Sequence, residues 1–190
     1  MCIRGLLFKT VLILIGIVVN QSAAQNQYQS IILSHTNQPL FPGKTLAVKA
    51  IYDVSDGNSS LTGIGVRIHF DSRKLHFIKF QNVAGGLVGD PDIKIETPDK
   101  QDNDPNTDTY ILFPWYSLQG NWPNQSLPLE VVHLYFTASN TAPECTTTIN
   151  AIRSSGAFGY EFRSDKALIY IRDKVDLIDV IQILQKLSRM

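Results

Sequence analysis

The chain has 190 residues, with 17 basic against 17 acidic side chains and a formal net charge of zero. This length suits one globular domain with a core of its own. The balanced charge argues against the classes of protein that bind nucleic acid or an anionic membrane surface.

The N-terminal segment is typical of a secretory leader. Arg4 and Lys9 precede an apolar run, and small residues end at Ala24. The run is shorter than the about 20 residues of a membrane-spanning helix. We therefore expect residues 1–24 to be a signal peptide that is cleaved after Ala24, with an uncleaved anchor as the alternative.

Cleavage would leave residues 25–190, with 15 basic against 17 acidic side chains and a net charge of −2. Cys145 would be the one remaining cysteine, so an internal disulfide is excluded. The expected mature protein is secreted or held at the cell surface, and it has no stable membrane span.

Residues 25–171 have the patterns of short strands. From Ile64 to Phe70, apolar residues alternate with small or polar residues, the period of two that marks a strand with one wet face. Similar runs predict strands at 30–34, 46–52, 74–80, 109–116, 129–138, 146–152, 158–162 and 167–171. Turn residues separate these runs, and no helical crossover pattern lies between them. The sequence predicts an all-β fold, a two-sheet antiparallel sandwich of jelly-roll type with about nine strands.

Residues 172–190 are predicted to form a C-terminal amphipathic helix. Its apolar stripe at helical spacing consists of Leu177, Val180, Ile181, Leu184 and Leu187. An apolar stripe usually packs on the rest of its own domain, so we expect the helix to dock on the sandwich. Pairing of the helix with another chain is the alternative.

An acidic loop precedes the predicted strand 109–116. Its carboxylates are Asp99, Asp102, Asp104 and Asp108. Ca²⁺ binds six to eight oxygen ligands, and Asp102 and Asp104 point the same way in an extended segment. The loop is a candidate calcium site, with Asp53 and Asp56 as possible additional ligands from another loop, although it lacks the spacing of an EF-hand. The alternative is an ordinary solvated loop.

Three aromatic residues after the loop are candidates for binding sugar rings. Trp122 lies between Asn121 and Pro123 and could present a flat face, with Tyr116 beside it. A loop tryptophan that plugs the end of the sandwich is the alternative for Trp122. Trp115 alternates with Ile111 and is expected in the core instead.

No catalytic constellation can be identified. The histidines of the mature chain form no HxH or HExxH pattern, and His69 and His76 are expected to be surface residues of strands. There is no G-x-S-x-G and no phosphate loop. The sequence favours a protein that is not an enzyme.

The segment AIYDVSDGNSSLTGIGVRIHFDSRKLHFIKFQNV, residues 50–83, resembles the front of a cohesin-like domain. The resemblance lies in a strand that runs from Gly63 to Phe70-Asp71 and a following strand that begins at Leu75. The phrase TDTYILFPWYSLQGNWPN resembles the middle of a bacterial subgroup of such exported domains. The family belongs to a superfamily of carbohydrate-binding sandwiches, and its members often dock other proteins through one sheet face.

The stretch VDLIDVIQILQKL, residues 175–187, resembles the end of a dockerin-type calcium loop and its helix. The first three ligand positions of such a loop would be Leu168, Tyr170 and Arg172, none of which is a carboxylate. Only one half-motif is present, so no calcium is predicted there.

The resemblances imply an exported, non-catalytic binding or scaffolding domain that is associated with carbohydrate binding or polysaccharide breakdown. Its partner would be a polysaccharide or an extracellular protein. The alternative is a protein–protein interaction subunit that docks through a sheet face or through the C-terminal helix.

Overall fold

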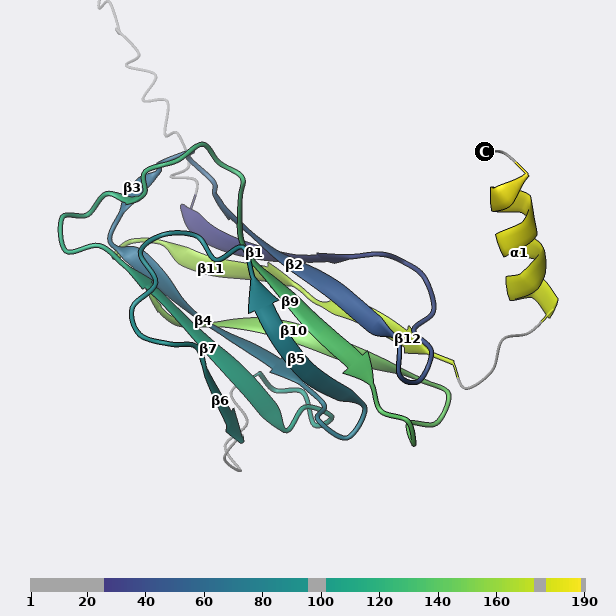
Figure 1. Ribbon diagram of the computed structural model, residues 1–190. Coiled ribbons are helices and arrows are strands. Elements are labelled where there is room, and N and C mark those ends of the chain that lie inside the picture. The colour runs from purple at the N-terminus through teal and green to yellow at the C-terminus, as the bar shows by residue number, and fades with distance from the viewer. Residues whose placement is uncertain (1–25, 96–101, 173–176, 189–190) are drawn as a thin grey trace, which may run out of the picture.

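Figure 1 shows the computed structural model, in which two β-sheets face each other and one helix follows at the C-terminal end. The structure describes residues 26–95, 102–172 and 177–188. The predicted signal peptide lies outside the described residues, so export and cleavage stay predictions. Within the described ranges, no helix is long and apolar enough to cross a membrane.

The two sheets have five strands each. Sheet A has the order β11-β1-β2-β9-β5, with β11 (Glu161–Asp165), β1 (Tyr28–His35), β2 (Thr45–Val54), β9 (Leu129–Ala138) and β5 (Leu75–Gln81). Sheet B has the order β12-β10-β4-β7-β6, with β12 (Ala167–Ile171), β10 (Cys145–Gly156), β4 (Gly63–Phe70), β7 (Thr109–Tyr116) and β6 (Asp92–Ile95). A short ribbon joins β3 (Ser60–Leu61) to β8 (Trp122–Pro123).

Strand pairing within both sheets is antiparallel except between β1 and β11, which run parallel. The predicted two-sheet antiparallel sandwich is therefore confirmed, with ten strands in its two sheets rather than about nine.

The core lies between the sheets because the strands alternate as their sequences predict. In β7, Ile111, Phe113 and Trp115 are buried, whereas Tyr110 and Leu112 on the opposite side are partly exposed. The prediction that Trp115 belongs to the core is confirmed by its exposed fraction of 2%.

One buried polar side chain connects several elements. The Nε2 atom of Gln29 donates to the hydroxyl of Tyr52 at 2.8 Å and to the carbonyl of Gly63 at 3.1 Å. Its Oε1 atom accepts from the backbone N–H of Ala157 at 2.9 Å. Burial raises the pKa of Tyr52 to about 12, so this hydroxyl stays protonated well above neutral pH.

The C-terminal helix α1 (Leu177–Leu187) stands apart from the sandwich in Figure 1. Val180, Ile181, Leu184 and Leu187 are 41–61% exposed. The helix itself was correctly predicted, but the expected docking on its own sandwich is wrong. The reason is that the two sheets already bury their apolar faces against each other, so the core offers the helix no open face.

Candidate functional site

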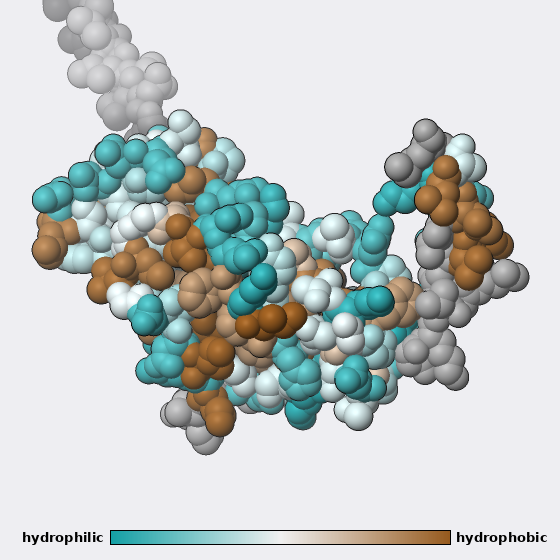
Figure 2. Space-filling view, in the orientation of Figure 1, coloured by the Kyte–Doolittle hydropathy of each residue, from teal (hydrophilic) through white to brown (hydrophobic). Residues whose placement is uncertain are grey.

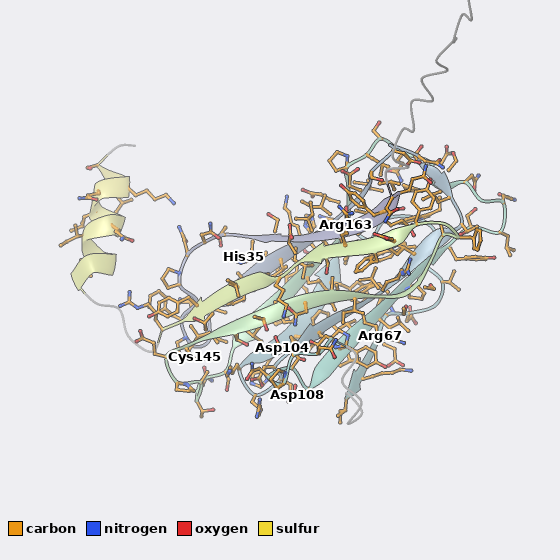
Figure 3. The ribbon with its side chains drawn as sticks, turned by 180° about the vertical axis from the view of Figure 1, so that it is seen from behind. His35, Arg67, Asp104, Asp108, Cys145 and Arg163 are labelled. Carbon is orange, nitrogen blue, oxygen red and sulfur yellow. The ribbon has the colours of Figure 1, made fainter. Side chains whose placement is uncertain are left out.

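The acidic loop packs against β10 through Asp104, which is 6% exposed. The Oδ2 atom of Asp104 accepts from the Thr148 hydroxyl at 2.8 Å and from Asn150 Nδ2 at 3.2 Å, and it lies 3.7 Å from Lys166 Nζ. Its Oδ1 atom accepts from the backbone N–H and from the Nδ2 of Asn106, both at 3.0 Å. Figure 3 shows Asp104 beside β10.

These hydrogen bonds decide the charge of Asp104. Burial alone would raise its pKa, but the donors on Asn106, Thr148 and Asn150 outweigh burial and hold the pKa well below its usual range. Asp104 is therefore an ionised carboxylate that fastens the loop to the sheet.

Asp102 takes part in the same arrangement. Its Oδ2 atom accepts from the Thr107 hydroxyl at 2.7 Å and from Asn150 Nδ2 at 3.0 Å. The same atom lies 3.9 Å from Nδ1 of His69, whose side chain is 1% exposed. Asn150 therefore donates to both carboxylates, which lie together as the sequence predicts.

The Asp108 carboxylate does not share partners with Asp102 and Asp104, and neither do the carboxylates of Asp53 and Asp56. The Asp108 carboxylate accepts from the backbone N–H and the hydroxyl of Ser72, at 2.7 and 3.0 Å, in the turn between β4 and β5. Asp53 accepts from the backbone N–H of Val54 at 2.8 Å, and Asp56 accepts from the Tyr160 hydroxyl at 2.8 Å. Asp99 lies outside the described residues.

The structure thus brings together Asp102 and Asp104 but not Asp108, Asp53 or Asp56. Over the part of the chain that the structure describes, no group of three or more histidine, cysteine or acidic side chains is arranged to hold a metal ion. The predicted convergence of these carboxylates on one ion is therefore wrong for the described residues. The reason is that the carboxylates of Asp108 and Asp56 accept hydrogen bonds from backbone N–H groups of two separate turns, at Ser72 and at Asn58. Calcium binding by Asp102 and Asp104, with ligands from other groups, stays a prediction.

Calorimetric titration with Ca²⁺ tests this prediction. Binding at Asp102 and Asp104 should release or absorb heat and raise the melting temperature, because an ion that binds only the folded state stabilises it. The Asp102→Ala/Asp104→Ala protein is the control and should show neither effect. Absence of both effects in the unaltered protein would leave the two carboxylates as hydrogen-bond acceptors only.

Trp122 is buried, with an exposed fraction of 3%. Its ring centroid lies 4.7 Å from that of Tyr52 and 6.0 Å from that of Trp115, and its Nε1–H donates to the Gly85 carbonyl at 2.8 Å. The prediction of an exposed platform is wrong for this residue. The alternative, a tryptophan that plugs the end of the sandwich, is what the structure shows.

Gly86 makes this packing possible. It has a φ of +86°, and a Cβ atom at this position would lie 2.7 Å from Cδ1 of Trp122. A side chain there would be strained by the backbone and would also collide with the indole. The Gly85-Gly86 pair therefore supplies both the hydrogen-bond acceptor and the space for the ring.

The histidines do not converge. His69 lies on β4 in sheet B and His76 on β5 in sheet A, so they are not neighbours on one sheet. His69 is buried rather than on the surface as expected, since the acidic loop lies beside it and its ring packs 5.3 Å from that of Tyr110. The alternation in β4 predicts only that the His69 side chain points away from the core. The sequence does not reveal that the acidic loop covers this side chain, because that loop is distant in the chain.

The outer face of sheet B is rich in apolar and aromatic side chains. We define the sheet B face as Arg67, Tyr110, Leu112, Pro114, Tyr116, Ile152, Leu168 and Tyr170. Leu112, Arg67 and Ile152 lie side by side on neighbouring strands. The guanidinium carbon of Arg67 lies 5.6 Å from the centroid of the Tyr110 ring. Tyr116, a predicted ligand-binding residue, is 50% exposed.

The outer face of sheet A is more polar. Lys49 donates to Glu130 at 2.6 Å, and His133 Nε2 lies 2.8 Å from the other oxygen of that carboxylate. Asn82 Nδ2 lies 3.0 Å from Nδ1 of the same histidine. Interface centres are enriched in aromatic residues and arginine and depleted in lysine and acidic residues. The outer face of sheet A also carries an arginine over a tyrosine ring, since the guanidinium carbon of Arg163 lies 3.9 Å from the centroid of the Tyr28 ring. The sheet B face differs because Leu112 and Ile152 flank its arginine on the neighbouring strands.

No known family profile matches the chain, and no curated protein matches it. Among solved structures, a chain in the crystal structure of a complex that contains CaCohA2 matches with a TM-score of 0.51 and 12% identity. The match covers 75% of this chain and 99% of that chain. The chain has a cohesin-like fold.

Two further cohesin structures are similar at lower scores. The solution structure of CaCohA2 from Clostridium acetobutylicum has a TM-score of 0.47 and 12% identity, covering 76% of this chain and 91% of that chain. A chain of a type I cohesin–dockerin complex from Clostridium thermocellum has a TM-score of 0.49 and 8% identity. The match covers 77% of this chain and 95% of that chain. The likeness is one of fold. The dockerin resemblance of residues 175–187 stays a prediction.

Proposed function

We propose that this protein is an exported, non-catalytic docking module that binds an extracellular protein through the sheet B face. The observation that carries the proposal is the composition of that face. Five apolar or aromatic side chains with an arginine over a tyrosine ring lie on strands β7, β4 and β10. A rigid sheet presents them at low cost in conformational entropy.

The fold supports the same proposal. The solved structure with the TM-score of 0.51 is a complex that contains CaCohA2, so a chain of this fold takes part in a protein assembly there. A link to carbohydrate binding or polysaccharide breakdown is a finer proposal. It rests on Tyr116, the exposed aromatic residue of the predicted sugar site, since Trp122 is buried.

Affinity capture from the secreted fraction of the source organism tests the docking face. The Leu112→Lys/Tyr116→Ala protein should lose its captured partner, with affinity falling about tenfold or more, because removal of central apolar anchors dominates interface energetics. Tyr135→Ala changes a half-exposed aromatic residue on the outer face of sheet A and is the matched control. Equal capture by all three proteins would contradict docking through the sheet B face.

The exposed stripe of α1 favours a second candidate, in which the helix makes the partner contact. The same capture distinguishes the two, using a protein that lacks residues 173–190. Retention of the partner by this truncated protein supports the sheet B face, whereas its loss with an unchanged melting temperature supports the helix. Release of sugar from a panel of polysaccharides would show instead that the protein is an enzyme.

A further inference from the structure

Strand β6 is the free edge of sheet B. It pairs with β7 from Asp92 to Ile95, and no other described residue pairs with its second side. All four of its residues are exposed. A strand edge with unpaired backbone N–H and C=O groups is a template on which another strand can add.

The side chains of β6 divide by face. Ile93 lies opposite Ile111, a core residue, so it points to the inner side of the sheet, as Ile95 does. These two isoleucines are 53% and 84% exposed. Asp92 and Lys94 point to the outer side, where the Lys94 Nζ atom lies 3.2 Å from the Asp92 carboxylate. The free edge is thus apolar on one face and carries one charge of each sign on the other.

The apolar face continues beyond β6. Val88 extends the same edge, since its N–H donates to the Pro114 carbonyl of β7 at 2.8 Å, and its side chain is 54% exposed. On the same open side of the sandwich, Ile78 of β5 is 48% exposed. Figure 2 shows apolar residues along the side where β5 and β6 lie.

We propose that a second copy of this chain pairs with β6, antiparallel and about a two-fold axis through Ile93, to form a homodimer. In this register Ile93 lies opposite the partner's Ile93. Asp92 lies opposite the partner's Lys94, and symmetry repeats that pair. A two-fold axis through Asp92 or Lys94 would place identical charges opposite each other, which destabilises a strand pair.

The register also defines the extent of the contact. Pro91 lies opposite the partner's Ile95 and has no N–H, so the ladder ends there. A contact this short falls in the small, weak class of interfaces. The dimer would join the two B sheets into one continuous ten-stranded sheet and would cover the exposed isoleucines of both copies.

The pairing of Asp92 with the partner's Lys94 can be tested by sedimentation equilibrium of the full protein, at protein concentrations up to about 1 mM. Asp92→Lys and Lys94→Asp should each raise the dimer dissociation constant about tenfold or more, since each places like charges opposite each other twice. The Asp92→Lys/Lys94→Asp protein should return to within about threefold of the original value, because it restores both opposite pairs. Lys44→Asp changes a distant exposed charge and should have no effect.

A disulfide tests the same register independently. In a Cys2→Ser/Cys145→Ser background, Ile93→Cys should give a covalent dimer on mild oxidation, since directly opposite Cα atoms lie about 4.5–5.5 Å apart. Ile95→Cys is the matched control and should not cross-link, because its symmetry mate is four positions away, about 13 Å along the strand. A monomer at every concentration, a dimer unaffected by the single charge changes, or equal cross-linking by both cysteine proteins would overturn the proposal.

Discussion

Replacing Trp122 with alanine should lower the free energy of unfolding by about 3–5 kcal/mol. The indole is buried against Tyr52 and Trp115, so its removal leaves a cavity at the end of the sandwich. It also removes the donor of the hydrogen bond to the Gly85 carbonyl. Denaturation in urea, followed by circular dichroism, measures the effect.

Trp122→Phe is the informative control, because it keeps an apolar ring but loses the N–H donor and part of the ring volume. We expect a smaller loss of about 1–2 kcal/mol. A loss below about 1 kcal/mol for Trp122→Ala is typical of exposed positions and would contradict the structural role. Such a result would favour a sugar-stacking role for Trp122.

Replacing Asp104 with alanine should cost about 2–4 kcal/mol of stability. The carboxylate is 6% exposed and accepts hydrogen bonds from Asn106, Thr148 and Asn150. Its removal leaves the donors on Asn106 and Thr148 without this acceptor, whereas Asn150 keeps its hydrogen bond to Asp102. Asp108→Ala is the control, since Asp108 is partly exposed and its carboxylate contacts the turn residues Ser72 and Arg73. A loss of about 1 kcal/mol is expected there.

The contribution of Asp104 also depends on pH. Its folded-state pKa is depressed below the about 3.9 of an unfolded aspartate. The stabilisation is therefore complete above that value and is lost as the pH falls through the lower, folded-state pKa. The difference in stability between the original protein and Asp104→Ala should shrink below about pH 4. An equal difference at pH 7 and at pH 2 would show that the carboxylate charge is not what fastens the loop.

The strands could be predicted because their period of two is local. The alternation in residues 109–116 correctly places Trp115 in the core without reference to any partner strand. Trp122 has no such neighbours, since it lies in a strand of two residues. Its burial depends on Tyr52 and the Gly85-Gly86 turn, which are distant in the chain.

The acidic loop was predicted as a cluster of oxygens, and its carboxylates do lie together. The donors that satisfy them, Thr148 and Asn150, are more than 40 residues away from Asp104 in the chain. Polar residues on a strand carry no signal of the loop that will cover them. The burial of His69 under the loop was missed for the same reason.

The C-terminal helix could be predicted from the sequence, but its packing partner could not. Its apolar stripe correctly predicted a helix, because the spacing of side chains on a helix is a local property. The stripe does not specify which surface it meets. The structure leaves it exposed, so the choice between a partner and the chain's own sandwich depends on surfaces that lie outside the helix.

The parallel pairing of β1 with β11 has a mechanical consequence. Tyr28 pairs with Glu161 at one end of the sandwich, and Leu40 pairs with Ile171 toward the other. A force that pulls on Tyr28 and Ile171 in opposite directions would therefore slide β1 along β11. The hydrogen bonds of a sheet lie across its strands, so such a force loads the bonds of the pair together rather than one after another. We therefore expect a module built in this way to resist tension along its length.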